Sequence, residues 1–293
     1  MGTNASSGPR EYVYDPTWGK LPEGLSDWAF VPAVVVDSED RVYVNQRGPA
    51  SIVVYSPDGE ILATWGAQFE KGAHGLQIRQ EADGEYLYFA DVARHCIVKT
   101  TLDGRVLWTL GTPGKVGASG QPFNRPTSVA FGPDGDFYVS DGYGNRRVHH
   151  FDPDRHLIHS WGEQGTGPSQ FSLVHHVWYD TRGDWPRLWV CDRENNRIQI
   201  FTTEGEYVEE KTGVVRPNNT WVDAEGYMYV TELGAGLTIF DPKDRLLQKL
   251  PGGGPREPGS ILKPHGIWGD SKGRLYVAEV EEGHRIQRFV RKR

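Results

Sequence analysis

Hydrophobic and polar residues alternate along this chain in short runs, and helical spacing is absent over any useful length. One unit recurs: an apolar strand, an Asp-Gly-type turn, a second strand ending in Asp or Glu, a polar connection, and two further strands. Two copies stand out, VSDGYGNRRVHHF at residues 139–151 and VCDRENNRIQIF at residues 190–201. Repeats of about 40 to 50 residues with four strands each are typical of β-propeller blades. The pattern therefore predicts an all-β fold.

The repeat can be counted along the chain. The missing outer strand of the last unit has a candidate at residues 11–19, because EYVYDPTWG resembles the unit endings ILATWG and LIHSWG. A terminal strand that completes the last blade closes the ring and covers an exposed sheet edge. We predict a flexible segment over residues 1–10 and a single six-bladed propeller over residues 11–293. Its units occupy about 29–66, 72–111, 123–162, 171–213, 215–253 and 260–292.

Composition narrows the partners and the compartment. The net charge of −7 argues against nucleic-acid binding, because phosphate recognition needs a basic surface. No apolar run has the length of a membrane span or the form of a signal peptide. Cys96 and Cys191 are the only cysteines, so a disulfide framework is not indicated. We expect a cytoplasmic monomer that acts on a small molecule, with no nucleic acid or membrane as partner.

Histidines stand at the start of the first strand in alternate units: His74 in GAHGL, His175 in SLVHH and His265 in KPHGI. In a six-bladed ring these positions are about a third of a turn apart and face the central channel. Three imidazoles around one point, with one position left open, suit a catalytic Zn²⁺, and other divalent transition metals bind the same donors. We predict a metal site at these three histidines. Strand alternation is expected to turn the neighbouring His176 away.

A second layer of candidate residues follows the second strand of several units. Arg47 lies in NQRG, Tyr143 in SDGYGN and Arg193 in DREN, and the last two are expected at the same place in their units. The planar fork of a guanidinium group recognises carboxylates. A phenol beside a metal and two guanidinium groups is suited to act as a general base. We therefore expect Tyr143, Arg47 and Arg193 to be catalytic, and the two arginines also to bind the substrate.

At these residues the chain resembles the peptidyl-α-hydroxyglycine α-amidating lyases, which are six-bladed propellers of the NHL-repeat class. The similarity runs from about Val34 to the C-terminus, and its most specific segments are FNRPTSVAFGPDGDFYVSDGYGNRRV, WGEQGTGPSQFSLVHH and CDRENNRIQIF. The resemblance implies cleavage of the C–N bond of an α-hydroxyglycine, a carbinolamide, to an amide and glyoxylate. It also implies zinc ligands, a catalytic base and two active-site arginines, which match His74, His175 and His265, then Tyr143, then Arg47 and Arg193.

The chain departs from the family pattern at three points. The family's structural calcium uses two backbone carbonyls, matching Val34 and Leu76, and a carboxylate where this chain has Gly266, so a family-type Ca²⁺ is not expected. The family's tyrosine precedes a disulfide-bonded cysteine, whereas Tyr143 precedes Gly144, which fits a reducing compartment. No monooxygenase domain precedes the repeats. We therefore expect a separate oxygenase to make the substrate, an N-acyl or N-alkyl hydroxyglycine.

Two other functions are alternatives at this stage. One is a metal-dependent propeller hydrolase of esters or lactones, although such sites resemble calcium centres built from Asp, Glu and Asn. The other is a non-enzymatic NHL-repeat interaction module, which has no need of three matched histidines at the axis. The metal-dependent C–N lyase is the favoured hypothesis because it accounts for the histidines, the tyrosine and the arginines together.

Overall fold

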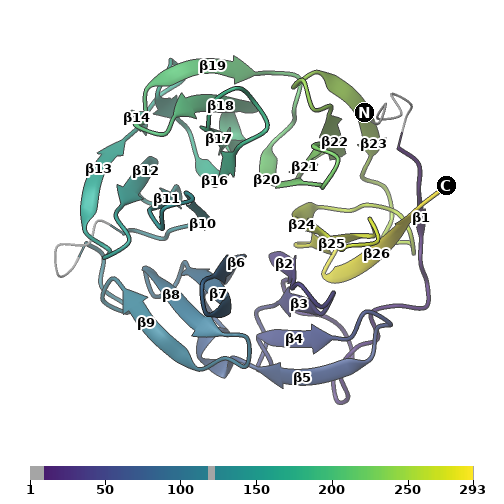
Figure 1. The fold of residues 1–293 in the computed structure, drawn as a ribbon. Helices are drawn as coiled ribbons and strands as arrows, with labels where there is room; N and C mark the ends of the chain where they lie inside the picture. The colour runs from purple at the N-terminus through teal and green to yellow at the C-terminus, as the bar shows by residue number, and fades with distance from the viewer. Residues whose placement is uncertain (1–9, 118–122, 293) are drawn as a thin grey trace.

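The computed structural model describes residues 10–117 and 123–292. Over this part of the chain, six four-stranded antiparallel sheets surround a central axis (Figure 1). Each sheet has one edge strand at the axis and the other at the rim. We number these sheets blades 1 to 6 in the chain order of their innermost strands. The predicted six-bladed β-propeller is confirmed.

Within each blade, strands that follow one another in the chain lie side by side, and blade 6 takes its outermost strand from the N-terminus. Blades 1 and 2 contain β2 (Ala33–Val36), β3 (Val42–Asn45), β4 (Ile52–Tyr55), β5 (Ile61–Trp65), β6 (Ala73–Glu81), β7 (Gly84–Asp91), β8 (Cys96–Thr101) and β9 (Val106–Leu110). Blades 3 and 4 contain β10 (Ser128–Phe131), β11 (Phe137–Asp141), β12 (Arg147–Phe151), β13 (Leu157–Trp161), β16 (Val174–Asp180), β17 (Arg187–Asp192), β18 (Arg197–Thr202) and β19 (Tyr207–Lys211). Blades 5 and 6 contain β20 (Pro217–Val222), β21 (Met228–Glu232), β22 (Gly236–Phe240), β23 (Leu246–Pro251), β24 (Pro264–Gly269), β25 (Leu275–Glu279), β26 (Arg285–Arg291) and β1 (Tyr12–Tyr14).

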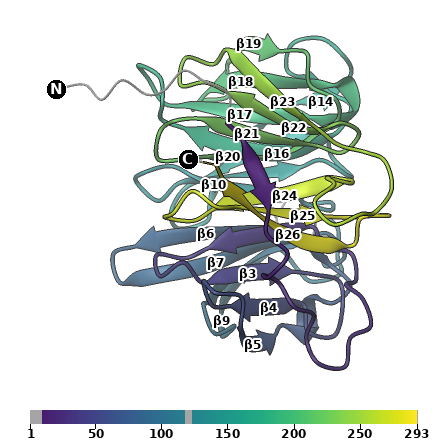
Figure 2. The ribbon, with the colours of Figure 1, turned by 90° about the vertical axis from the view of Figure 1, so that its right-hand side faces the viewer.

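The N-terminal strand completes blade 6, as the sequence predicts. Tyr12 pairs with Arg291 and Tyr14 with Phe289, so β1 lies antiparallel to β26. Figure 2 shows this purple strand against the yellow C-terminal blade. An ion pair of 2.5 Å between Asp15 and Arg288 adds to the pairing. The two ends of the chain are thereby joined in one sheet.

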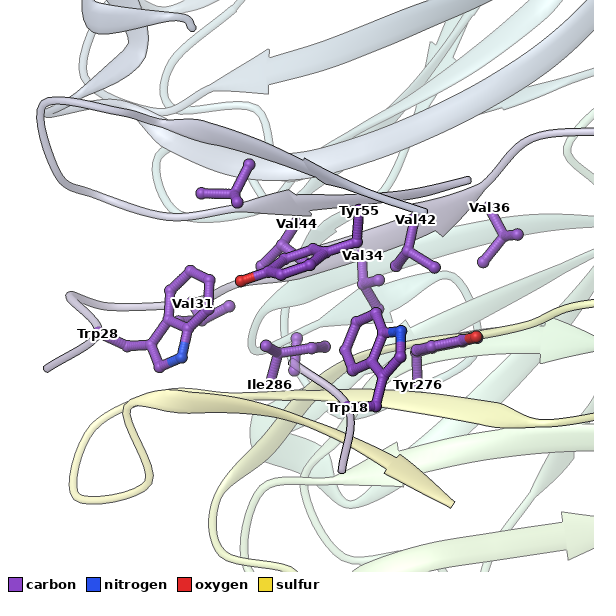
Figure 3. Packing of buried hydrophobic residues seen from close by; sticks show 12 residues of the cluster. Trp18, Trp28, Val31, Val34, Val36, Val42, Val44, Tyr55, Tyr276 and Ile286 are labelled. Atoms are coloured by element: carbon purple, nitrogen blue, oxygen red, sulfur yellow. The ribbon is translucent and has the colours of Figure 1, made fainter. Parts of the chain in front are cut away.

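The seam between the first and last blades is filled by aliphatic and aromatic side chains (Figure 3). Trp18, which is 5% exposed, lies between Tyr55 of blade 1 and Tyr276 of blade 6, with ring centroids 4.9 and 4.8 Å away. The Tyr55 hydroxyl also donates a hydrogen bond of 2.6 Å to the carbonyl of Lys20. Buried aromatic side chains dominate the energy of such contacts. The segment after β1 therefore holds the ring closed as well as finishing its last sheet.

The flexible segment predicted over residues 1–10 lies outside the described residues except for Arg10. That residue is 3% exposed, and its Nη1 is 2.6 Å from the Asp223 carboxylate. Arg10 is thus part of the packed structure, and the described propeller begins one residue before the predicted boundary.

Among the described residues, four short elements outside the blades have no signal in the repeat. They are a parallel pair formed by β14 (Glu163–Gln164) and β15 (Gln170–Phe171), and the 3-10 turns Ala67–Phe69 and Arg193–Asn195. Cys96 and Cys191 are buried and free. In the described ranges, no helix has the length and apolar character needed to span a membrane.

Candidate metal centre

Each of the three predicted ligand histidines occupies a β-bulge at the start of an innermost strand. In blade 2, Ala73 pairs with Asp91 and Gly75 with Ala90, which leaves His74 as the extra residue. The same irregularity places His175 in β16 and His265 in β24 outside the pairing register. A bulge bends its strand and redirects the extra side chain. The strands β6, β16 and β24 alternate with β2, β10 and β20 around the axis (Figure 1), and the three imidazoles lie close together.

The three imidazoles form a compact, buried triangle. Their ring centroids are 5.0 Å apart for His74 and His175, 4.9 Å for His74 and His265, and 4.7 Å for His175 and His265. One nitrogen from each ring lies within 4.8 Å of the others, and the residues are 1%, 2% and 4% exposed, respectively. The structure therefore brings together all three residues that the sequence proposes as metal ligands.

Backbone carbonyls of the intervening blades orient these rings. His74 Nδ1 lies 2.8 Å from Thr127 O, His175 Nδ1 2.7 Å from Asn218 O, and His265 Nδ1 2.7 Å from Pro32 O. A carbonyl only accepts hydrogen bonds, so each Nδ1 carries the proton and each Nε2 keeps a free lone pair. Ligand histidines in metal sites are commonly held in this way. The six blades thus alternate between supplying an imidazole and supplying the carbonyl that fixes its tautomer.

The donor set fits a divalent transition metal ion. His265 Nε2 is buried and has no hydrogen-bond partner among the described residues, which is costly unless a ligand uses its lone pair. Burial lowers the pKa of His74 and His175 well below the usual range, and nearby positive charge lowers both further. Burial likewise lowers the pKa of His265 to about 3. Neutral imidazole is the form that binds metals, so the site is competent for binding at neutral pH.

Tyr143 reaches the same centre from the connection between β11 and β12. Its hydroxyl lies 3.1 Å from His74 Nε2 and 3.4 Å from His175 Nε2. Since His74 Nδ1 carries the ring proton, Tyr143 donates its proton to His74 Nε2 in this arrangement. The phenol is therefore adjacent to the nitrogens that would face a metal ion.

Arg193 and Arg47 approach Tyr143 in different ways. Arg193 Nη1 donates to the Tyr143 hydroxyl at 3.4 Å, while its Nε bonds the Glu194 carboxylate at 2.8 Å. Arg47 donates through Nε to the carbonyl of Ala73 at 2.8 Å, and its guanidinium carbon lies 4.4 Å from the centroid of the Phe30 ring. Arg193 is thus bonded to Tyr143, whereas Arg47 is bonded to the backbone of Ala73, the residue before His74.

Tyr143 and Arg193 stand at the same place in their units only when counted back from the third strand, since each lies four positions before the arginine that pairs with the aspartate. Asp141 pairs with Arg147, six positions later, whereas Asp192 pairs with Arg197, only five positions later. The connection that carries Tyr143 is therefore one residue longer, and Tyr143 follows its aspartate by two residues rather than one.

Buried aspartates brace these connections. The Asp141 carboxylate accepts hydrogen bonds from the backbone N–H of Asn124 at 2.9 Å and from the Asn145 side chain at 2.7 Å. Asp192 accepts from Ser172 N at 3.0 Å and from Arg197 Nε at 2.9 Å. These carboxylates point into the loops and support the tyrosine and arginine without touching the centre.

Arg125 is a further residue beside Tyr143, and its place was not predicted from the sequence. Its guanidinium carbon lies 5.0 Å from the centroid of the Tyr143 ring. The signal available in the sequence was an arginine before Pro126 in the unit that carries Tyr143, but Arg216 precedes Pro217 in the same way. Only the tertiary structure places Arg125 over the phenol.

The residues present do not fit the calcium site of the family. A Cβ atom at Gly266 would lie 2.7 Å from Ala33 Cα and 2.8 Å from Pro32 O, so the backbone leaves no room for a carboxylate there. A hard cation without its charged ligand binds weakly. The expected lack of family-type Ca²⁺ stays a prediction.

Sequence comparisons agree with this architecture. An NHL repeat model matches residues 123–151. Human NHL repeat-containing protein 3 is 34% identical over 209 residues, which are 67% of this chain and 58% of that protein. Peptidyl-alpha-hydroxyglycine alpha-amidating lyase 1 of Drosophila melanogaster is 32% identical over 179 residues, 56% of this chain and 32% of that protein. The chain thus spans less than two thirds of the length of these curated relatives.

Solved structures share the fold at low identity. A gluconolactonase of Xanthomonas campestris superposes with a TM-score of 0.66 and 14% identity, over 98% of this chain and 91% of the gluconolactonase. Fold and centre together define an NHL-type six-bladed propeller with three histidines converging on its axis. These similarities support the peptidyl-α-hydroxyglycine α-amidating lyase family for this chain, as the resemblance in the sequence indicates.

Proposed function

We propose that the protein is a metal-dependent carbon–nitrogen lyase that cleaves an α-hydroxyglycine-type substrate to an amide and glyoxylate. The observation that carries the proposal is the position of the Tyr143 hydroxyl, 3.1 and 3.4 Å from the Nε2 atoms of His74 and His175. A phenol at this distance from a three-nitrogen centre is suited to take a proton from a hydroxyl held there. The similarity to a fly amidating lyase supports the same reaction.

His74, His175 and His265 would hold Zn²⁺ or another divalent transition ion. When bound, such an ion supplies Lewis acidity toward the hydroxyl of the substrate. Arg47 and Arg193 bind the substrate carboxylate beside Tyr143, because a guanidinium group presents two parallel donors to a carboxylate. Binding at two points fixes the hydroxyl next to the phenol oxygen.

In the reaction, Tyr143 acts as the base in its phenolate form. It takes the proton of the substrate hydroxyl, and the freed electron pair forms the second bond of the aldehyde carbonyl. The C–N bond breaks, its electron pair stays on nitrogen, and nitrogen receives the proton from Tyr143 and leaves as the amide. Arg193 Nη1, 3.4 Å from the phenol oxygen, stabilises the negative charge of the Tyr143 phenolate before the first proton transfer and again after the second.

The substrate follows from the same proposal. A hydroxylated N-acyl or N-alkyl glycine carries the hydroxyl, carboxylate and C–N bond that these residues address. Its precursor lacks the hydroxyl, and we propose that a separate oxygenase supplies the substrate. We further propose that the protein works as a cytoplasmic monomer.

The test is glyoxylate release from α-hydroxyhippurate by the purified protein, with Zn²⁺ and after chelation by EDTA. We expect one glyoxylate for each benzamide formed, with activity lost on chelation and restored by added metal. Cleavage of aryl esters or lactones without glyoxylate release would instead identify the hydrolase. Protein that retains no transition metal and releases no glyoxylate would contradict the lyase and favour an interaction module.

A further inference from the structure

Arg125 lies beside the histidine centre, in contact with the same phenol ring as Arg193. Its guanidinium carbon is 5.0 Å from the centroid of Tyr143, and that of Arg193 is 5.6 Å away. The backbone of Arg125 is held by a hydrogen bond of 3.0 Å from its N–H to His95 Nδ1. Two residues later, the carbonyl of Thr127 orients His74. A fixed backbone thus presents an exposed cationic side chain beside the proposed base.

Two other blades carry a cation at the corresponding place. Arg216 and Lys263 each precede a proline and have left-handed backbones with φ of 48° and 52°, compared with 67° for Arg125. Both are neutralised, since Arg216 pairs with Glu194 at 3.0 Å and Lys263 with Glu281 at 3.2 Å. Arg125 has no carboxylate within ion-pair distance in the described parts of the chain. Of these three repeat-related cations, the one over Tyr143 is therefore the one without a counter-charge.

Arg47 is a second guanidinium near Tyr143 without a carboxylate in ion-pair distance among the described residues. Its Nε donates to a backbone carbonyl instead. Burial lowers the pKa of Arg47, and the positive charge of Arg125 lowers it further. Arg193, in contrast, already bonds Glu194. Arg125 lies over the Tyr143 ring, and Arg47 is near enough to feel the charge of Arg125, so two guanidinium groups without an ion-pair partner in the described structure are suited to bind negative charge there. One carboxylate of a glycine-derived substrate neutralises only one of them.

We propose that Arg125 is a further substrate-binding residue, and that it recognises a second anionic group on the substrate. The preferred substrates are then dianions, namely α-hydroxyglycines whose N-acyl group carries a carboxylate of its own. Arg47 and Arg193 take the carboxylate next to the hydroxyl, and Arg125 takes the one on the acyl group. This inference rests on the proposed lyase function and specifies its substrate class.

The test uses unreactive analogues that lack the hydroxyl, so that binding is measured without turnover. Hippurate is the monoanion, and N-(4-carboxybenzoyl)glycine is the matching dianion. Dissociation constants are measured by calorimetry for the zinc-loaded wild-type protein, for Arg125→Gln and for the control Lys263→Gln. Lys263 shares the repeat position, the left-handed backbone and the following proline, but its charge is paired.

We expect the wild-type protein to bind the dianion about 10-fold or more tightly than hippurate, as one charge-assisted contact provides. Arg125→Gln should abolish this preference while binding hippurate almost as before, and Lys263→Gln should keep it. Equal binding of the two analogues by the wild type, or a preference that survives Arg125→Gln, would overturn the inference. So would equal losses of kcat on monoanionic and dianionic hydroxyglycines in Arg125→Gln, because Arg125 would then act through Tyr143.

The inference and the proposed function fail separately. A dianion preference that depends on Arg125, in a protein that releases no glyoxylate, would retain the anion site and reject the lyase reaction. Glyoxylate release with no dianion preference would retain the lyase reaction and reject the role of Arg125.

Discussion

Replacing His265 with alanine should remove most of the stability that the protein gains from a transition metal. The substitution deletes one of three converging nitrogens and leaves two imidazoles, which is an incomplete donor set for Zn²⁺. A ligand present at about 1,000 times its dissociation constant stabilises the folded state by about 4 kcal/mol. For a chain of this size that corresponds to a rise in Tm of roughly 6–7 °C.

The same substitution should change the metal-free protein much less. His265→Ala loses the hydrogen bond to the Pro32 carbonyl, but it also removes a buried Nε2 that has no partner in the described structure. Each of these effects amounts to about 1–2 kcal/mol, and they oppose one another. The difference between metal-loaded and EDTA-treated samples therefore isolates the metal site from general damage to the fold.

Differential scanning calorimetry with Zn²⁺ or with EDTA measures this difference directly. His176→Ala is the matched control, because His176 is also buried, also has an unpartnered Nε2 and lies one residue from His175. The control should keep the metal-dependent rise in Tm, and His265→Ala should lose it. An equal rise in wild type and His265→Ala would refute metal binding at the three histidines. A loss in both variants would refute the assignment of His175 rather than His176.

Three further predictions concern stability. Trp18→Ala should lower the free energy of unfolding by about 3–5 kcal/mol in urea titrations, because it leaves a cavity in the seam between blades 1 and 6. A loss of less than about 1 kcal/mol would show that Trp18 does not hold the ring closed. Burial lowers the pKa of His176 to about 3, and an unfolded histidine titrates near pH 6.5. The unfolded ring therefore takes up a proton first, and metal-free protein should lose about 1.4 kcal/mol per pH unit from this residue as pH falls below about 6.5. Urea titrations at several pH values should show a shallower acid dependence in His176→Gln, and an unchanged slope would contradict a neutral buried ring. Gly266→Ala should destabilise by about 1–3 kcal/mol, because its Cβ would lie 2.7 Å from Ala33 Cα; unchanged thermal unfolding would mean that the backbone there gives way.

The blades could be predicted from the sequence because their signals are local. Asp-Gly turns such as 58–59 and 134–135 place glycine at positive φ, as seen for Gly59 at 93° and Gly135 at 97°. The closing strand was also predictable, since its ending resembles those of other units. The pairing of β14 with β15 has no such repeat, and only the structure shows it.

The histidine triangle was predictable from spacing, but its construction was not. A bulge is a property of two paired strands. The sequence around His74 does not indicate which residue is left unpaired. The orienting carbonyls belong to backbone of neighbouring blades, so no side-chain pattern marks them. The extra residue in the connection between β11 and β12 likewise could not be predicted, and it places Tyr143 two residues after its aspartate where Arg193 follows by one. These features depend on contacts between blades rather than on the repeat itself.

Replacing Tyr143 with phenylalanine tests whether this tyrosine is the general base of the proposed lyase reaction. Tyr143→Phe removes one oxygen and leaves the histidines in place, so metal content should be unchanged. With α-hydroxyhippurate as substrate, kcat for glyoxylate release should fall by about 10²- to 10⁴-fold, because the general base is lost. The control Tyr14→Phe, in the strand that closes blade 6, should keep wild-type activity. Glyoxylate release at the wild-type rate by metal-loaded Tyr143→Phe would show that Tyr143 is not the general base.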